Sequence, residues 1–225
     1  MSLKGAVVAF DLDGTLVDTA PDLIGALNQV LGEQGLPSVP LEAARHLVGH
    51  GVRALLERGF AESGRTLSAD TSPPLVERFI EVYVGRIAEE SRPFEGVEAA
   101  LDELSGAGAR LAVCTNKRTD LSIALLDALE LTSRFEAVVG SDQARQKPDP
   151  ALLYLAIRRA GGLPARALFV GDSRVDLQTA RAAGVPIVGV SFGMSDPPLV
   201  QGDVDAFIHS YAELPRTARR LLGAG

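Results

Sequence analysis

Short apolar runs that alternate with helical patterns limit the fold of this chain more than any other feature of its sequence. The apolar runs have the length of buried strands and lie at residues 6–10, 110–115, 137–140, 167–171 and 186–190. Helical patterns separate the later runs, at 119–129, 150–160 and 176–183, and a short strand at 205–208 precedes an amphipathic helix at 212–222. Such alternation is typical of βαβ units. The sequence therefore predicts an α/β fold around a parallel sheet.

The stretch from residue 18 to residue 92 breaks this alternation. It contains no convincing strand, and helices are expected at residues 22–33, 41–48, 52–63 and 74–90. In the last of these, apolar residues at helical spacing indicate a core stripe rather than a binding face: Leu75, Phe79, Val82 and Tyr83. Pro21 stands near the first turn of the first helix and Gly35 follows its end, as is common at helix boundaries. We therefore expect an all-helical second domain at residues 18–92, inserted into a core formed by residues 1–17 and 93–225.

Two carboxylates follow the first apolar run directly. Asp11 and Asp13 come at its end, and Gly14 indicates that the chain is already turning there. Both acids are then expected at the carboxyl edge of the sheet, where open α/β folds place their ligands. Two such acids repel each other unless a cation or a proton lies between them. The alternative is a turn rich in Asp and Gly that caps the next helix.

Polar residues also follow later apolar segments. Thr115, Asn116 and Lys117 come at the end of the second run, where a hydroxyl, an amide and backbone N–H groups at a helix start form a phosphate cradle. A simple N-cap is the alternative for this segment. Lys147 precedes a proline that restricts its direction, and it would neutralise nearby carboxylates unless it is a solvated loop lysine.

Two more acids follow the run at residues 167–171. Asp172 lies at its tip and Asp176 lies in the first turn of the next helix, where a carboxylate also serves as a plain cap. Acids from distant segments that meet at one edge suit Mg²⁺, which takes few carboxylates and completes its shell with water and phosphate oxygens. The sequence therefore predicts a magnesium site formed by strand tips.

The overall charge narrows the class of partner. The formal net charge of −7 and the pI of about 5.0 argue against a nucleic acid or an anionic membrane surface. The chain has neither an apolar stretch long enough to span a membrane nor a secretory signal pattern, so the cytoplasm is the expected location. The single cysteine, Cys114, lies in an apolar run and is expected to be a buried structural thiol.

The polar segments, in their order along the chain, resemble the motifs of the haloacid dehalogenase-like phosphatases. The matching positions are the DxDGT run at 11–15, Thr115, Lys147 and the GDSxxD run at 171–176. The resemblance covers essentially the whole chain and implies a Rossmann-like, doubly wound parallel sheet with an inserted all-helical cap domain. Residues 11–22 and 170–176 look particularly like the phosphoglycolate phosphatase branch, with Thr19 where Ser is common.

The resemblance implies a role for each catalytic motif. Asp11 would be the nucleophile that accepts the phosphoryl group. Asp13 would protonate the leaving group and then deprotonate the attacking water. Thr115 and the amide of Asn116 would hold the phosphoryl oxygens, and Lys147 would supply positive charge beside the nucleophile.

The same resemblance implies a bound Mg²⁺ as cofactor. Its ligands would be Asp11, Asp172 and the backbone carbonyl of Asp13, and Asp176 would order the surrounding shell. The ion would screen the approach of a carboxylate to a phosphate.

The helical insert contains a turn, residues 49–51, that loosely matches a dinucleotide-binding fingerprint. Because the turn follows a helical pattern, a helix–helix turn within the cap is the simpler interpretation. Such a turn can face the catalytic site, so His50, Arg53 or His46 could contact a substrate carboxylate. A surface position is the alternative for each of them.

The expected function is a Mg²⁺-dependent phosphomonoesterase that acts on a small phosphorylated metabolite, with 2-phosphoglycolate as the leading substrate. A phosphonate hydrolase is excluded because residues 18–110 contain no lysine to form its Schiff base. A β-phosphoglucomutase would carry a histidine where this chain has Leu23. Phosphatases of other sugar phosphates, such as N-acetylmuramate 6-phosphate, and a non-catalytic phospholigand-binding module are the alternatives. The chain is expected to be a monomer or a homodimer.

Overall fold

The computed structural model describes residues 2–49 and 51–223, and its centre is a six-stranded sheet in the order β5-β4-β1-β6-β7-β8. All neighbouring strands are parallel. The strands are β1 (Val7–Phe10), β4 (Arg110–Cys114), β5 (Ala137–Val139), β6 (Ala167–Gly171), β7 (Ile187–Val190) and β8 (Ala206–Ile208). Each coincides with a predicted strand, and no end differs by more than one residue. The α/β fold with a parallel sheet is therefore confirmed.

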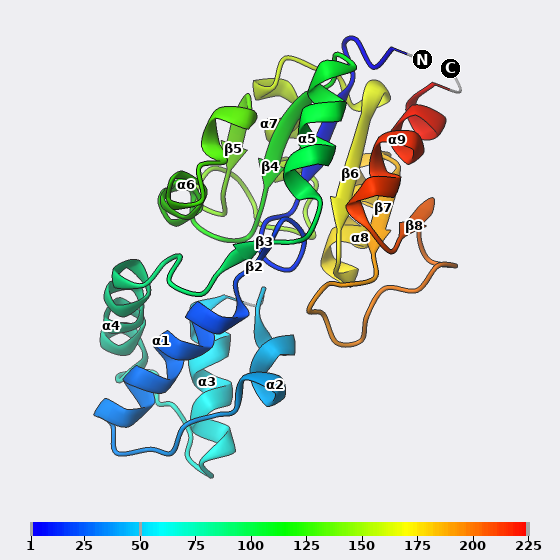
Figure 1. Ribbon diagram of the computed structural model, residues 1–225. Helices are drawn as coiled ribbons and strands as arrows, with labels where there is room; N and C mark the ends of the chain where they lie inside the picture. Colours follow the sequence, from blue (N-terminus) through cyan, green and yellow to red (C-terminus); the bar gives the residue numbers. More distant parts are fainter. Residues whose placement is uncertain (1, 50, 224–225) are drawn as a thin grey trace.

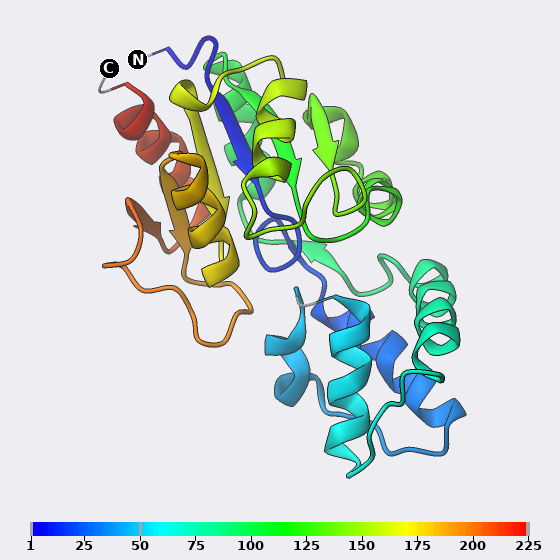
Figure 2. The same cartoon turned by 180° about the vertical axis from the view of Figure 1, so that it is seen from behind.

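Helices cover both faces of the sheet (Figures 1 and 2). One face carries α5 (Val97–Gly106), α6 (Thr119–Ala128) and α9 (Leu214–Leu222), and the other carries α7 (Ala151–Arg159) and α8 (Arg174–Ala183). In β1, Val8 and Phe10 are buried on the first side, whereas Val7 and Ala9 are buried on the second. Side chains alternate along a strand, so a strand covered on both faces is apolar at every position. This explains the unbroken apolar runs in the sequence.

One helix and a pair of short strands were not expected from the sequence. The helix α5 carries apolar residues at helical spacing, and Val97, Leu101 and Leu104 are buried against the sheet. Its pattern was therefore available in the sequence. The antiparallel pair of β2 (Val17–Asp18) and β3 (Arg92–Pro93) has only two residues in each strand, which is too short to give a periodic signal.

The chain between β2 and β3 folds into a helical block at the carboxyl edge of the sheet (Figure 1). Its elements are α1 (Ala20–Glu33), α2 (Leu41–Ala44), the 3₁₀ turn η1 (Arg45–Leu47), α3 (Val52–Glu62) and α4 (Ser72–Gly85). The helix expected at 41–48 is thus a short α-helix followed by a 3₁₀ turn, and the helix expected to reach residue 90 ends at Gly85. In the described residues, no helix is long and apolar enough to cross a membrane.

The helical block has a hydrophobic core that the loop after β7 joins through Met194. Phe79 and Tyr83 of α4 pack in it with Leu27 and Leu31 of α1 and with Leu56 of α3. The apolar stripe predicted on α4 is therefore a core stripe. The division into domains stays a prediction, and the predicted boundaries lie within the β2–β3 pair.

Asp22, in the first turn of α1, joins the start of the helical block to its end. Its buried carboxylate accepts hydrogen bonds from the backbone N–H of Ser91 (2.7 Å), the Ser91 hydroxyl (2.7 Å), the backbone N–H of Glu90 (3.1 Å) and the Arg86 guanidinium (3.4 Å). A buried carboxylate requires such donors, because it has left water. This network fixes where the chain leaves and re-enters the sheet domain.

Candidate active site

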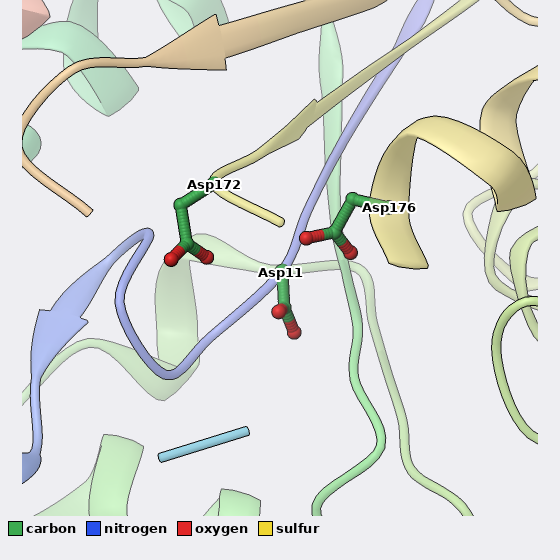
Figure 3. Close-up of side chains that lie close together, drawn as sticks. All are labelled: Asp11, Asp172 and Asp176. Atoms are coloured by element: carbon green, nitrogen blue, oxygen red, sulfur yellow. The ribbon is translucent and has the colours of Figure 1, made fainter. Parts of the chain in front are cut away.

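The carboxyl edge of the sheet brings three acids together. The strands β1 and β6 are neighbours with Phe10 opposite Val170, so Asp11 and Asp172, which follow closely after these strands, reach the same place. Asp176 arrives there from the first turn of α8. Figure 3 shows the three carboxylates facing one another. One oxygen from each lies within 4.8 Å of the others, and all three side chains are buried.

Asp172 is held by donors from two loops. Its carboxylate accepts hydrogen bonds from the Thr15 hydroxyl (3.1 Å), the Met194 backbone N–H (3.0 Å) and the Ser195 hydroxyl (2.9 Å). A Cβ atom at Gly193 would lie 2.2 Å from the Asp172 Cβ, so the loop after β7 approaches this closely because residue 193 is glycine. Neither Gly193 nor Ser195 belongs to a recognisable sequence motif, so neither was predicted as a site residue.

Lys147 lies between two of the acids. Its Nζ is 2.7 Å from Asp176 Oδ1 and 2.9 Å from Asp11 Oδ1, and its burial rules out a solvated loop lysine. The Asn116 side chain accepts a hydrogen bond from the Lys147 backbone N–H (2.9 Å) and donates one to the Lys147 carbonyl (3.0 Å). The Asn116 side chain therefore positions Lys147, which leaves the Asn116 backbone N–H for the expected contact with a phosphoryl group.

The helix-cap alternative holds for Asp176 but not for Thr115, because the N-cap of α6 is Arg118 and has no side-chain cap hydrogen bond. The buried Thr115 hydroxyl accepts a hydrogen bond from the Lys117 backbone N–H (3.2 Å). Ser173 and Asp176 form a reciprocal capping box at the start of α8. Asp176 is thus a helix cap and an ion-pair partner of Lys147 at the same time, so the two interpretations are compatible.

Burial governs the charge state of the acid cluster. It raises the pKa of Asp11 to about 7, although Lys147 lowers this pKa and the neighbouring Asp176 and Asp172 raise it further. Burial raises the pKa of Asp172 as well. Burial acts to lower the pKa of Lys147, but Asp11 and Asp176 raise it above its ordinary value. Lys147 therefore stays protonated and pairs with Asp11 and Asp176, while Asp172 is held by neutral donors.

The acid cluster fits a divalent cation. Asp11 Oδ1 is buried and, among the described residues, has no hydrogen-bond partner in spite of its closeness to Lys147. Three buried carboxylates beside one lysine leave negative charge out of water, which is unfavourable, whereas a hard cation takes carboxylate oxygens as ligands. The cluster of Asp11, Asp172 and Asp176 is therefore a site that could bind a metal ion.

Asp13 lies at the same edge and pairs with a different lysine. Lys117 Nζ is 3.1 Å from Asp13 Oδ1 and donates a hydrogen bond to the Tyr83 hydroxyl at 2.8 Å. The same Nζ lies 4.4 Å from the centre of the Tyr83 ring. Because Tyr83 belongs to α4, this contact joins the helical block to the sheet domain. Lys117 was expected in the phosphate cradle and Tyr83 in the core, and the sequence has no signal that the two side chains meet beside Asp13.

Two cavities meet beside Asp13. One of about 350 Å³ lies between the helical block and the sheet domain, and one of about 40 Å³ lies over Asp11 and Lys147. Asp13, Asn116 and Lys117 line both of them. The arrangement gives room for a small ligand that touches Asp11 and extends past Asp13.

Of the helical-block residues expected to set specificity, the structure describes the side chain of Arg53. Arg53 lines the larger cavity, but its side chain is 66% exposed and pairs with Glu57. His50 and the side chain of His46 lie outside the described residues.

Comparisons with known proteins identify the class to which this fold and site belong. Residues 8–190 match the family model of the haloacid dehalogenase-like hydrolases, and the chain belongs to this family. The family resemblance seen in the sequence is therefore confirmed.

Within the family, the chain is similar to proteins named phosphoglycolate phosphatase. It is 53% identical to that of Caulobacter vibrioides, with 98% of this chain and 93% of the relative covered. It is 43% identical to that of Mesorhizobium japonicum, with 97% of each chain covered. The crystal structure of a predicted phosphoglycolate phosphatase from Haemophilus somnus has a TM-score of 0.88 at 29% identity, covering 96% of this chain and 99% of that one.

Proposed function

We propose that this chain is a Mg²⁺-dependent phosphomonoesterase that hydrolyses 2-phosphoglycolate through a phosphorylated aspartate. The observation that carries the proposal is the buried cluster of Asp11, Asp172 and Asp176 around Lys147, next to a small cavity. The names of relatives that are similar over nearly the whole chain support the choice of substrate.

The proposed reaction consists of two displacements at phosphorus. In the first, an oxygen of Asp11 forms a bond to phosphorus while the bond to the ester oxygen breaks, and Asp13 gives its proton to the departing alcohol. In the second, a water molecule forms a bond to phosphorus, the bond to Asp11 breaks, and Asp13 takes a proton from the water. The products are the alcohol and inorganic phosphate. The covalent intermediate divides one slow hydrolysis into two easier steps.

Donors at the carboxyl edge would hold the phosphoryl oxygens during both steps. These donors are the Thr115 hydroxyl, the Asn116 backbone N–H and the Lys147 ammonium group. Lys147 is fixed by two carboxylates and by the Asn116 side chain, so it needs little reorganisation as charge develops. Donors fixed in advance in this way stabilise a transition state most effectively.

Mg²⁺ would be held by Asp11, Asp172 and the backbone carbonyl of Asp13, with Asp176 ordering the surrounding shell. The buried cluster of Asp11, Asp172 and Asp176, in which Lys147 pairs with only two of the three carboxylates, supports this assignment. The ion supplies positive charge that reduces the repulsion between a carboxylate nucleophile and a phosphate dianion.

The helical block would act as a cap over the reaction. Its α4 already reaches the sheet domain through the contact between Tyr83 and Lys117, and its residues line the larger cavity. Closure of such a cap sequesters the reaction from water and aligns the substrate. Residues 18–92 would then be the cap domain, with Arg53 and His50 as candidate specificity residues.

The test is a rate comparison across phosphorylated metabolites, including N-acetylmuramate 6-phosphate, with Mg²⁺ and with EDTA. We expect the highest kcat/KM for 2-phosphoglycolate, loss of activity in EDTA and its recovery on adding Mg²⁺. Asp11→Asn should lose about 10³-fold or more in kcat, because the nucleophile is gone. Asp127→Asn, at an exposed acid on α6, is the matched control.

Each contrary result has a distinct meaning. Wild-type activity in Asp11→Asn would refute the assigned nucleophile. A faster ester than 2-phosphoglycolate would replace the proposed substrate while the reaction class stands. Binding of phosphate esters without hydrolysis would favour a phospholigand-binding module.

A further inference from the structure

Among the described residues, four cations line the two cavities, and they differ in their surroundings. Lys147 is engaged by the acid cluster. Arg53 and Arg118 have side chains that are 66% and 54% exposed, and each pairs with a nearby acid on the surface. Lys117 is different, because it is a buried cation that faces the larger cavity. It is therefore the cavity cation best placed to bind an anionic group with little competition from water.

Lys117 has one donor to spare. An ammonium group carries three N–H donors, and the described residues that accept from Lys117 Nζ are Asp13, at 3.1 Å, and the Tyr83 hydroxyl, at 2.8 Å. The Tyr83 ring also limits where the ammonium group can move, since the Nζ lies 4.4 Å from the ring centre. The third N–H is available to a ligand in the cavities that Lys117 lines.

Given the proposed function, the position of Lys117 beside Asp13 indicates which group of the substrate Lys117 contacts. A general acid must come within about 3 Å of the oxygen that it protonates, so Asp13 marks the place of the ester oxygen. In 2-phosphoglycolate the carboxylate is attached to the carbon that bears this oxygen. A cation 3.1 Å from Asp13 therefore lies within reach of that carboxylate.

We propose that Lys117 binds the substrate carboxylate and so selects phosphate esters that carry a carboxylate on the carbon next to the ester oxygen. Tyr83 acts through Lys117, as a positioning residue supplied by the helical block. The proposal rests on the proposed function and adds to it a residue of the sheet domain that distinguishes one class of ester. Esters of neutral alcohols leave the third N–H of the buried ammonium without a charged acceptor and bind less well.

The experiment compares 2-phosphoglycolate with its amide, 2-phosphoglycolamide, which has nearly the same shape but no charge on the distal group. The wild type should prefer the acid, and Lys117→Met should reduce the ratio of the two kcat/KM values by about 100-fold. Because the ratio is taken within one variant, any disturbance of Asp13 affects both substrates and divides out. Lys117→Arg, which keeps the charge, should restore part of the preference.

Arg118→Met is the matched control, since it removes a neighbouring cation that lines the same cavity but is exposed. Its acid-to-amide ratio should equal that of the wild type. If Lys117→Met hydrolyses neither ester, the ratio of the two dissociation constants is measured by calorimetry with Asp11→Asn, with and without Lys117→Met. If the acid-to-amide ratio in either assay is the same with and without Lys117, the proposal is overturned.

The results distinguish a failure of this proposal from a failure of the proposed function. If the wild type prefers another ester with a carboxylate at this position, and Lys117→Met loses that preference, the role of Lys117 stands and the substrate changes. If the wild type prefers 2-phosphoglycolate and Lys117→Met keeps the preference, the function stands and Lys117 is not its specificity residue.

Discussion

Burial raises the pKa of Asp11 to about 7 because its carboxylate loses contact with water. The ordinary value of 3.8 applies to the unfolded chain. Between about pH 4 and pH 7 the folded metal-free protein therefore binds more protons at this group than the unfolded chain does. Its stability then falls as the pH rises through this range, since stability decreases wherever the folded state is the more protonated one.

Asp11→Asn should remove this pH dependence, because an amide does not ionise. Lys147 would keep Asp176 as its partner, so the variant leaves the lysine paired. In EDTA, we expect the free energy of unfolding of the variant to exceed that of the wild type by more at pH 8 than at pH 5. The increase should be about 3 kcal/mol, since the interval from pH 5 to the folded pKa of about 7 spans about two pH units and each corresponds to about 1.4 kcal/mol. Urea unfolding curves at both pH values provide the measurement, and a difference between the two proteins that does not change with pH would contradict it.

The sequence predicts where some site residues lie, but it does not predict which residues they contact. The closeness of Asp11 and Asp172 follows from their place after parallel strands, whose carboxyl ends share one edge. The partners of these residues depend on loop paths, which have no periodic pattern. Ser195 reaches Asp172 through the loop after β7, and Lys117 reaches Asp13 across the site. These contacts could not be predicted from spacing alone.

At the scale of elements, α4 contributes to two parts of the molecule at once. The Tyr83 ring is packed in the core of the helical block, while its hydroxyl accepts a hydrogen bond from Lys117 in the sheet domain. The spacing of apolar residues on α4 predicted the first role, because packing of a helix follows its period. The second role depends on the position of the whole helix relative to β4, which its own sequence does not encode.

Tyr83→Phe tests the role of α4 while leaving the core packing in place. With the hydroxyl lost, Lys117 should be less well positioned, so we expect KM for 2-phosphoglycolate to rise about fivefold, as loss of a hydrogen bond worth about 1 kcal/mol implies. The KM for the amide analogue and the kcat for both should change little. Tyr154→Phe removes the hydroxyl of a half-exposed tyrosine on α7 and serves as the control. An equal rise in KM for the acid and the amide would show that Tyr83 acts on the cavity in general.

The elements themselves were predicted to different degrees. Every strand of the main sheet was found, because each is a short apolar run bounded by polar residues. The two-residue strands β2 and β3 were not found, since their pairing depends on a contact between segments far apart in the sequence. The predicted helix at 41–48 divides into a short α-helix and a 3₁₀ turn, a distinction that hydrophobic periodicity over so few residues does not make.

At the scale of the whole molecule, the candidate active site needs both the sheet and the helical block. The acid cluster belongs to the sheet domain, whereas the larger cavity has walls from both. The two parts are connected through β2 and β3 (Figure 1) and through the Asp22 network beside them. The geometry of this junction therefore decides whether Tyr83 meets Lys117 and how the cavity is shaped.

Asp22→Asn should weaken the junction, because an amide presents N–H groups where Ser91 and Glu90 also present donors. Asp22 is fully buried, and disrupting a buried charged network of this kind costs about 3 kcal/mol. We expect a loss of that size in the free energy of unfolding, measured in urea. We also expect a lower kcat/KM for 2-phosphoglycolate, because the helical block is no longer held in register with the acid cluster. Glu89→Gln, at an exposed acid that also lies near Arg86, is the control. If the unfolding curves of Asp22→Asn and Glu89→Gln coincide, the junction does not depend on the Asp22 carboxylate.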